Sequence, residues 1–358
     1  MKTHLTLAAA LAVGATGAFA GGTDRSGQSI SAIFEDGNYV EFSFGYASPS
    51  VSGSVGGGAV NSGNMASSYT TFGGAIKTEL SDKFAIGVIL DQPFGADVDY
   101  SEPPYPLAGT NAQVKTTGIT ILGKYQATDR ISVYAGPRMI TASGHYTLVS
   151  SGAPVFSSTF SSDTDIGYVV GAAYEIPDIA LRAAITYSSE TNFALKGNVR
   201  DPALFMGADL TATMPQSVNI DFQTGVAANT LAFAKIRWAD WSEGTIDAPG
   251  TIGNVTDYGN RDTWSYTVGV GRKFSEKFSG QASIGYEKST GAPTGNLAPT
   301  DGYWSLSVGG SYDLGNGAKI SGGISYVKVG NAVTEAPVSG VFADNSAWGV
   351  GLKFSQSF

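Results

Sequence analysis

Apolar and polar residues alternate along most of the chain, from Tyr39 to the last residue, Phe358. Around residue 265, for example, Trp264 and Tyr266 fall on one face of an extended chain and Ser265 on the other. This period-two pattern is typical of β-strands with one apolar and one polar face. Fourteen segments carry it: Tyr39–Ala47, Tyr69–Leu80, Lys83–Val98, Ala112–Gln126, Arg130–Leu148, Ser162–Glu175, Ile179–Glu190, Gln216–Val226, Thr230–Trp241, Thr263–Phe274, Lys277–Lys288, Gly302–Leu314, Ala318–Gly330 and Ser346–Phe358.

The connections between these segments alternate between six tight turns, such as Ser81-Asp82, and seven long loops, such as Val149–Ser161. An up-and-down antiparallel barrel has this pattern, with all its short turns at one end. A soluble sandwich or propeller also alternates. However, the strands reach membrane-spanning length, aromatic residues gather at strand ends, and the polar face is mostly Gly, Ser, Thr and Ala. We therefore predict an all-β fold: a 14-stranded antiparallel transmembrane β-barrel over residues 39–358.

Two segments precede the first strand. Residues 1–20 have a basic start, a short apolar run and the small-x-small sequence Ala18-Phe19-Ala20, which together indicate a cleaved signal peptide. Residues 21–38 are too few for a domain, but Ile30, Ile33 and Phe34 could insert into the lumen as a short plug. The alternative for this segment is a leader outside the barrel.

Composition narrows the function. Charged residues make up only 14% of the 358 residues, against about 25% in an average globular chain. The net charge of −9 argues against nucleic acid as a partner, because phosphates require a basic face. After the signal peptide the only histidine is His145, and no metal-ligand or nucleotide motif is present. We expect neither an enzyme nor a cofactor or metal.

Several stretches resemble one family in their order and spacing: "TDIGYVVGAAYEI", "LRAAITYSSETNFALKGNV", "LTATMPQSVNIDF" and "RWADWS". The chain resembles the FadL/TodX family of outer-membrane transporters. The resemblance implies a plugged 14-stranded barrel, passive transport of hydrophobic molecules, capture by extracellular loops, and lateral exit where the third strand kinks. The segment before the first strand is shorter than the family's plug and lacks its Asn-Pro-Ala motif.

The third strand contains a break signal of its own, in "LDQPFGADV". Pro93 cannot donate a hydrogen bond to a sheet, and Gly95 tolerates unusual backbone angles. We expect a kink formed by Asp91, Pro93, Phe94 and Gly95. Alternatively, Pro93 only ends the strand.

Substrate-binding candidates lie on the polar face of Thr230–Trp241, where lipid-facing alanines leave Phe233, Lys235 and Arg237 in the lumen. Two cations beside an aromatic ring would suit an amphipathic anion. They could instead pair with luminal carboxylates such as Asp221 or Glu287. Arg138, facing inward from the fifth strand, and Arg261 are further candidates for binding a carboxylate.

The loop 191–215 is unusually apolar for an exposed segment. It could form a capture groove or pack against neighbouring loops. The groove candidates are Phe193, Leu195, Lys196, Arg200, Leu204, Phe205 and Met206.

These patterns favour a channel for passive uptake of long-chain fatty acids or similar hydrophobic molecules. An aromatic hydrocarbon channel of the same family, a general porin and an adhesin are the alternatives. We expect a monomer in a Gram-negative outer membrane, in contact with its lipid and with both termini periplasmic. The terminal Phe358 resembles the signal that barrel-assembly machinery recognises.

Overall fold

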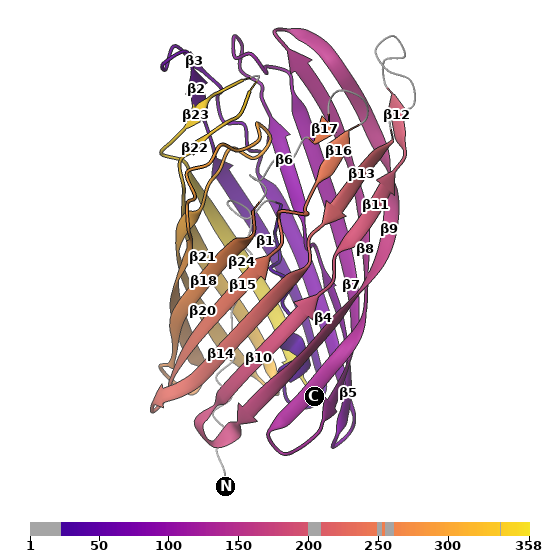
Figure 1. The fold of residues 1–358 in the computed structure, drawn as a ribbon. Coiled ribbons are helices and arrows are strands. Elements are labelled where there is room, and N and C mark those ends of the chain that lie inside the picture. The colour runs from indigo at the N-terminus through magenta and orange to yellow at the C-terminus, as the bar shows by residue number, and fades with distance from the viewer. Residues whose placement is uncertain (1–22, 200–208, 249–252, 255–260, 337) are drawn as a thin grey trace.

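The computed structural model describes residues 23–199, 209–248, 253–254, 261–336 and 338–358. Its main element is a closed antiparallel barrel (Figure 1), so the predicted 14-stranded fold is confirmed. The barrel strands are β1 (Tyr39–Ser50), β4 (Tyr69–Ser81), β5 (Phe84–Asp91) with its continuation β6 (Gly95–Asp99), β7 (Asn111–Gln126), β8 (Ile131–Ser150), β9 (Ala153–Ile176), β10 (Leu181–Ser188), β14 (Ser217–Ala227), β15 (Thr230–Ala239), β18 (Thr263–Lys273), β19 (Phe278–Glu287), β20 (Tyr303–Gly315), β21 (Ala318–Val329) and β24 (Ser346–Ser357).

The last strand closes the barrel against the first. β24 pairs with β1 in an unbroken register from Tyr39 opposite Ser357 to Ser50 opposite Ser346. The start of β1 and the end of β24 therefore lie at the same end of the barrel, where the short turns are (Figure 1). Closure satisfies the backbone groups that a free sheet edge would expose to lipid.

The structure corrects one predicted loop and one predicted strand. Residues 149–161, expected to form a long loop, belong almost entirely to β8 and β9, which continue as a hairpin to a tight turn. Ser151 and Gly152 supply the positive φ angles, 51° and 80°, that such a turn requires. The predicted strand Lys83–Val98 is two strands, β5 and β6, separated by residues 92–94.

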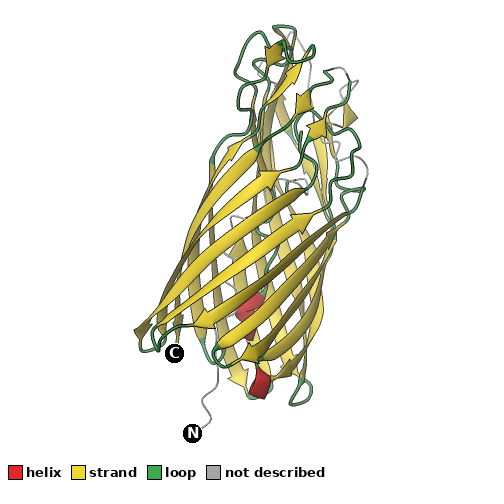
Figure 2. Cartoon of the chain, turned by 90° about the vertical axis from the view of Figure 1, so that its left-hand side faces the viewer, coloured by secondary structure: helices red, strands yellow, loops and turns green. Residues whose placement is uncertain are grey.

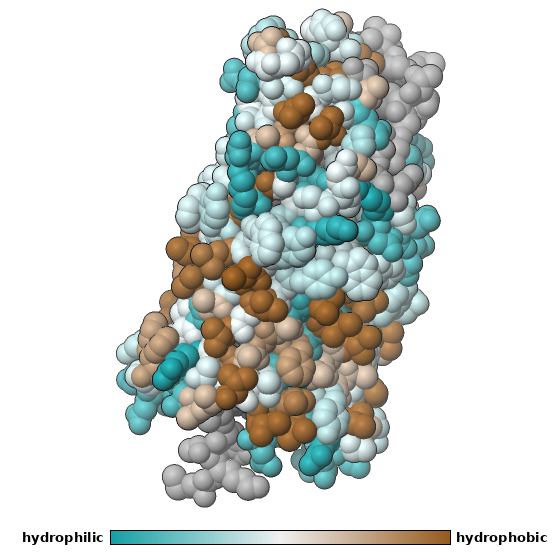
Figure 3. Space-filling model, turned by 60° about the vertical axis from the view of Figure 1, so that its left-hand side comes forward, coloured by the Kyte–Doolittle hydropathy of each residue, from teal (hydrophilic) through white to brown (hydrophobic). Residues whose placement is uncertain are grey.

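The outer wall of the barrel is apolar. Trp264, Val268, Leu306, Val350 and Leu352 are among the large apolar side chains exposed on it. Figure 3 shows hydrophobic side chains concentrated over the lower part of one face, below a paler, more hydrophilic band and the loops. This belt is what a barrel needs to lie in a hydrocarbon layer. No helix in the described ranges is long and apolar enough to cross a membrane.

The N-terminal segment 23–38 lies inside the barrel and carries the short helix η1 (Ser31–Phe34) (Figure 2). Ile30 and Ile33 are buried in a cluster that includes Leu122 of β7 and Tyr134 of β8. The Phe34 ring meets the Tyr134 ring edge-on at 5.5 Å. The segment is therefore packed against the β4–β10 side of the lumen.

Two small sheets fill the loop end of the barrel. One consists of β11 (Thr191–Leu195), β13 (Leu210–Met214), β16 (Ile246–Ala248) and β17 (Gly253–Asn254). The other consists of β22 (Ala332–Val333), β23 (Val341–Phe342), β2 (Gly53–Val55) and β3 (Val60–Asn61). A further short strand, β12 (Gly197–Val199), extends the barrel sheet by pairing with β9. Their inward side chains join the walls of β6, β7, β8 and β9 in one apolar cluster.

Candidate functional site

An apolar pocket lies where the first small sheet meets the barrel wall. It is lined by Thr23, Ala96, Val98, Ala112, Gln113, Val114, Ala142, Ser143, Gly144, His145, Tyr146, Phe160, Leu195, Leu210, Ala212, Met214, Ile246 and Leu297. Among these described residues there is no lysine, arginine, aspartate or glutamate. The pocket is therefore suited to an uncharged, hydrophobic molecule.

Of the predicted capture-groove residues that the structure describes, two are buried at the loop end and one is exposed to solvent. Phe193 and Leu195 are buried in the cluster at the loop end, because alternate residues of β11 turn inward, and Leu195 lines the pocket. Lys196 is exposed and pairs with Asp209, with 2.5 Å between Nζ and Oδ2. The hydrogen bond from Lys196 lowers the pKa of Asp209. The other groove candidates, Arg200, Leu204, Phe205 and Met206, lie outside the described residues.

The third strand is broken at residues 92–94, beside the pocket. Asp91 is the last residue of β5 paired with β7, and pairing resumes at Gly95 of β6. In the break, the Phe94 backbone N–H donates to Thr116 Oγ1, which donates in turn to the Phe94 carbonyl. Since Pro93 has no N–H to offer, this side-chain clamp replaces the interrupted ladder.

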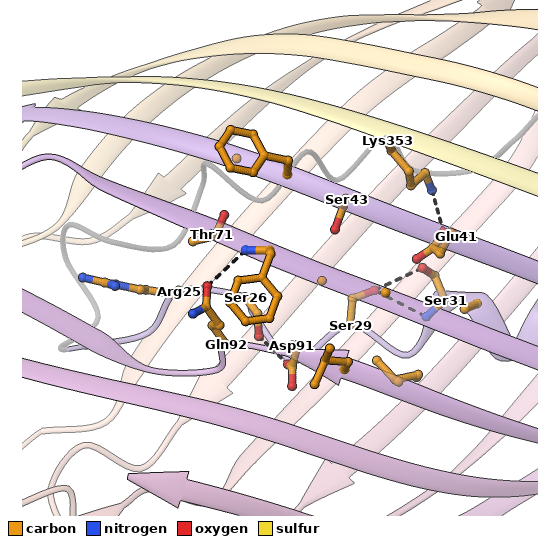
Figure 4. Close-up of a pocket in the computed structure, with 18 of the residues that line it drawn as sticks. Arg25, Ser26, Ser29, Ser31, Glu41, Ser43, Thr71, Asp91, Gln92 and Lys353 are labelled. Atoms are coloured by element: carbon orange, nitrogen blue, oxygen red, sulfur yellow. Dashed lines mark hydrogen bonds and ion pairs between the residues drawn. The ribbon is translucent and has the colours of Figure 1, made fainter. Parts of the chain in front are cut away.

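The break leaves a gap in the barrel wall between β4 and β6. β5 pairs with β4 only up to Gly74, and the β4 residues that precede Gly74 have no strand partner on that side among the described residues. The side chain of Gln92 fills part of the gap by accepting a hydrogen bond from the Phe72 backbone N–H at 3.1 Å. A second cavity lies at this gap, and Thr71, Gln92 and Asp91 are among the residues that line it (Figure 4).

Arg25 of the N-terminal segment bridges the two edges of this gap. Its guanidinium forms an ion pair with Asp97 of β6 at 2.6 Å and lies 3.8 Å from the centroid of the Tyr69 ring of β4. Gly95 allows this approach, since a Cβ there would lie 2.6 Å from the guanidinium. Backbone hydrogen bonds from Arg25 to Pro93 and from Gly95 to Thr23 hold the segment against the break.

The candidate cations of β15 are paired with carboxylates. Lys235 Nζ lies 3.5 Å from Asp221 Oδ1 on β14. Arg237 Nε lies 2.5 Å from Oδ2 of Asp24, in the N-terminal segment. Phe233 turns toward Gly269 of β18, where a Cβ would lie 2.3 Å from its ring. Both cations therefore form ion pairs with carboxylates, which is the alternative to substrate binding that the sequence left open. Asp221 is one of the expected partners, whereas Asp24 is not.

The remaining two basic candidates lie apart from each other. Arg138 is 2% exposed and donates to Thr120 and Ser188, while its Nη2 has no hydrogen bond to any described residue. Arg261 lines a separate cavity at the loop end, together with Lys288 and Asp301. The structure does not gather the predicted cations into one carboxylate site.

Sequence reasoning missed Asp24 and Arg25, which connect the N-terminal segment to β15, β6 and β4. The signal that was available is a pair of adjacent opposite charges in the otherwise small and polar stretch "GGTDRSGQS". Reasoning also missed Tyr146, Met214 and Ile246 as pocket residues, because they come from three separate segments.

Comparisons with known proteins agree with this geometry. The family model described as "Outer membrane protein transport protein (OMPP1/FadL/TodX)" matches residues 30–358. A search of curated protein sequences returned no match.

Solved structures of similar fold include a Pseudomonas aeruginosa FadL homologue, with a TM-score of 0.77 and 16% identity over 97% of this chain and 98% of that one. They also include the Pseudomonas putida toluene transporter TodX, with a TM-score of 0.68 and 14% identity over 96% of each chain. The Ralstonia pickettii toluene transporter TbuX has a TM-score of 0.63 and 14% identity over 90% of each chain. At these identities the structures support the fold, while the family model spans nearly the whole chain. The chain therefore belongs to the OMPP1/FadL/TodX family of outer-membrane transport proteins.

Proposed function

We propose that this protein takes up small uncharged hydrophobic molecules, such as aromatic hydrocarbons, through the apolar pocket at its loop end. The observation that carries the proposal is the pocket's lining, in which no described residue is a lysine, arginine, aspartate or glutamate. A carboxylate would be desolvated there without a cation to compensate it. The toluene transporters among the similar structures are consistent with this choice. The sequence favours long-chain fatty acids, with aromatic hydrocarbons as the alternative of the same family, and the lining of this pocket supports placing the hydrocarbons first in the proposal.

Release takes place sideways through the gap between β4 and β6. The pocket and the gap are close along the chain. Ala96 lines the pocket and follows Gly95 of the gap directly, and Thr23 lines the pocket two residues before Arg25, whose guanidinium approaches Gly95. A hydrophobic molecule gains nothing by entering water, so an exit into the membrane is favoured. Arg25 has to leave Tyr69 and Asp97 before the gap can open. In this arrangement the loop end is extracellular and both termini are periplasmic.

A second candidate substrate is a long-chain fatty acid, favoured by Arg138 alone. Its Nη2 is buried without a hydrogen-bond partner among the described residues, and a carboxylate is the strongest acceptor for such a group. Arg138 lies four residues before Ala142 of the pocket on the same strand. A fatty acid would therefore have to extend from the pocket toward the short-turn end of the barrel to reach Arg138.

Uptake assays separate the two candidates. Cells with and without the gene are given labelled toluene or labelled oleate, and liposome swelling with a small sugar serves as the porin control. We expect the gene to accelerate toluene uptake and to leave oleate uptake unchanged. Accelerated oleate uptake alone would establish the second candidate, and rapid sugar swelling without any hydrocarbon uptake would establish a general porin.

A further inference from the structure

Glu287 is a buried carboxylate that the ion pairs of the described residues leave over. It ends β19, 6% exposed, and strand pairing places it on the lumen face, opposite Ser265 of β18 and Tyr303 of β20. Its carboxylate forms no ion pair and no side-chain hydrogen bond with another described residue. An ionised carboxylate that is buried without a counter-charge is strongly unfavourable. This group therefore needs either a proton or a positive charge that the described chain does not supply.

The two cations on the neighbouring wall are already paired. Arg237 contacts Asp24, and Lys235 contacts Asp221. Arg237 is also separated from Glu287 by the full width of β18, since both pair with the same residue of that strand from opposite sides. Neither cation is available to compensate the charge of Glu287.

Glu287 faces a chamber whose wall is rich in hydroxyl groups. The chamber has a volume of about 130 Å³, whereas a polar cavity needs only about 10–15 Å³ to hold a water molecule. Its charged lining consists of three carboxylates and two cations, so the formal charge is 2 − 3 = −1. The full lining is Asp24, Ser26, Gly27, Ser29, Asn219, Asp221, Lys235, Ile236, Arg237, Thr263, Ser265, Thr267, Ser283, Glu287, Tyr303, Ser305 and Ser307.

The chamber is reached from the loop end. Glu287 and Thr263 line both the chamber and the separate cavity that contains Arg261. Asp262 and Lys288 are exposed and border that cavity, so water at the loop end has access to Glu287. Arg261 forms no ion pair with Glu287. Lys288 follows Glu287 directly, and strand alternation turns its side chain to the other face.

We propose that Glu287 binds one small monovalent cation in this chamber, either an alkali-metal ion or the ammonium group of an amine. One uncompensated carboxylate is balanced by one positive charge, and the hydroxyl oxygens of Ser265 and Ser305 replace part of the hydration shell of the cation. Calcium typically takes six to eight oxygen ligands, several of them from carboxylates. No group of three or more acidic, histidine or cysteine side chains that could hold a metal ion occurs among the described residues, which favours a single charge.

Equilibrium dialysis of the full chain in detergent micelles tests this site. Radioactive rubidium and labelled ethylammonium are the two probes, measured separately at neutral pH with the bulky cation N-methylglucamine as background. Glu287→Gln removes the charge with little change of shape, and Glu243→Gln makes the same change at an exposed carboxylate of the loop end. Ser265→Lys is a second test that keeps Glu287 but places a tethered ammonium group directly opposite it.

We expect wild type and Glu243→Gln to bind one cation per chain. The affinity should be at least about tenfold lower in Glu287→Gln, because a charge-assisted contact is lost. Ser265→Lys should lose binding as well, since its own ammonium group fills the site. Binding of rubidium alone would assign the site to an alkali-metal ion, and binding of ethylammonium would assign it to an amine. Folded wild type that binds neither probe, or equal binding by Glu287→Gln, would overturn the proposal, because Glu287 would then hold only a proton.

Discussion

Arg237 of β15 and Asp24 of the N-terminal segment form an ion pair, with 2.5 Å between Nε and Oδ2 and both side chains largely buried. Gln28 and Asn219 add hydrogen bonds around the guanidinium. This pair fastens the segment to the wall of the barrel that is not covered by its apolar residues. Arg237, which the sequence gives as a candidate for substrate binding, thus links the barrel wall to the segment in this structure.

Neutralising Asp24 should loosen the N-terminal segment. Removing one partner of a buried pair leaves the other charge uncompensated and typically costs about 3–5 kcal/mol. In Asp24→Asn we therefore expect amide hydrogen exchange over residues 25–34 to accelerate at least about 100-fold. Asp36→Asn, an exposed carboxylate in the same segment, is the control. Exchange as slow as in the wild type would mean that the pair does not anchor the segment.

Removing the guanidinium of Arg25 should ease opening of the wall gap. Arg25→Ala loses both the ion pair to Asp97 and the contact with the Tyr69 ring, so we expect faster uptake of labelled toluene. Arg25→Lys keeps a charge but not the planar group that stacks on a ring, and should give an intermediate rate. Slower uptake in Arg25→Ala, at equal amounts of folded barrel, would contradict a gating role.

Filling the apolar pocket should block uptake. Ala212 is buried in the pocket wall, and Ala212→Trp would occupy the space that a substrate needs. We expect toluene uptake to fall close to that of cells without the gene. Ala282→Trp places the same side chain at an exposed position on the outer face of β19 and should leave uptake unchanged. Equal uptake by both variants would place the binding site elsewhere.

The barrel could be predicted from the sequence because every strand repeats the same local rule, with lipid on one side and lumen on the other. The alternation around Trp264 and Tyr266 predicts a barrel strand from local residue types alone. Pro93 and Gly95 predict the break in the third strand in the same way. The partners inside the lumen could not be predicted in this way. The pairing of Arg237 with Asp24 joins residues 213 positions apart through a segment that has no periodicity. Leu195, Ala212 and Ile246 share a pocket only because two loops fold inward.

The most direct test of the account locks the N-terminal segment over the wall gap. Asp24 and Phe94 face each other in an antiparallel bridge. Flanking hydrogen bonds from Gly95 to Thr23 and from Arg25 to Pro93 enclose this pair. Opposed residues of that kind have Cα atoms about 4.5 Å apart, which is within the range of a disulfide. Since the chain has no cysteine, Asp24→Cys with Phe94→Cys creates one switchable bond.

Uptake of labelled toluene is measured in this variant before and after reduction. The control is a second disulfide, Ser307→Cys with Ser325→Cys, between opposed residues of β20 and β21 whose hydroxyls lie 2.8 Å apart. The account predicts uptake near background in the oxidised Asp24–Phe94 variant, recovery on reduction, and no effect of oxidation in the control. Undiminished uptake through the oxidised lock would contradict it, because the substrate would then leave without passing Arg25.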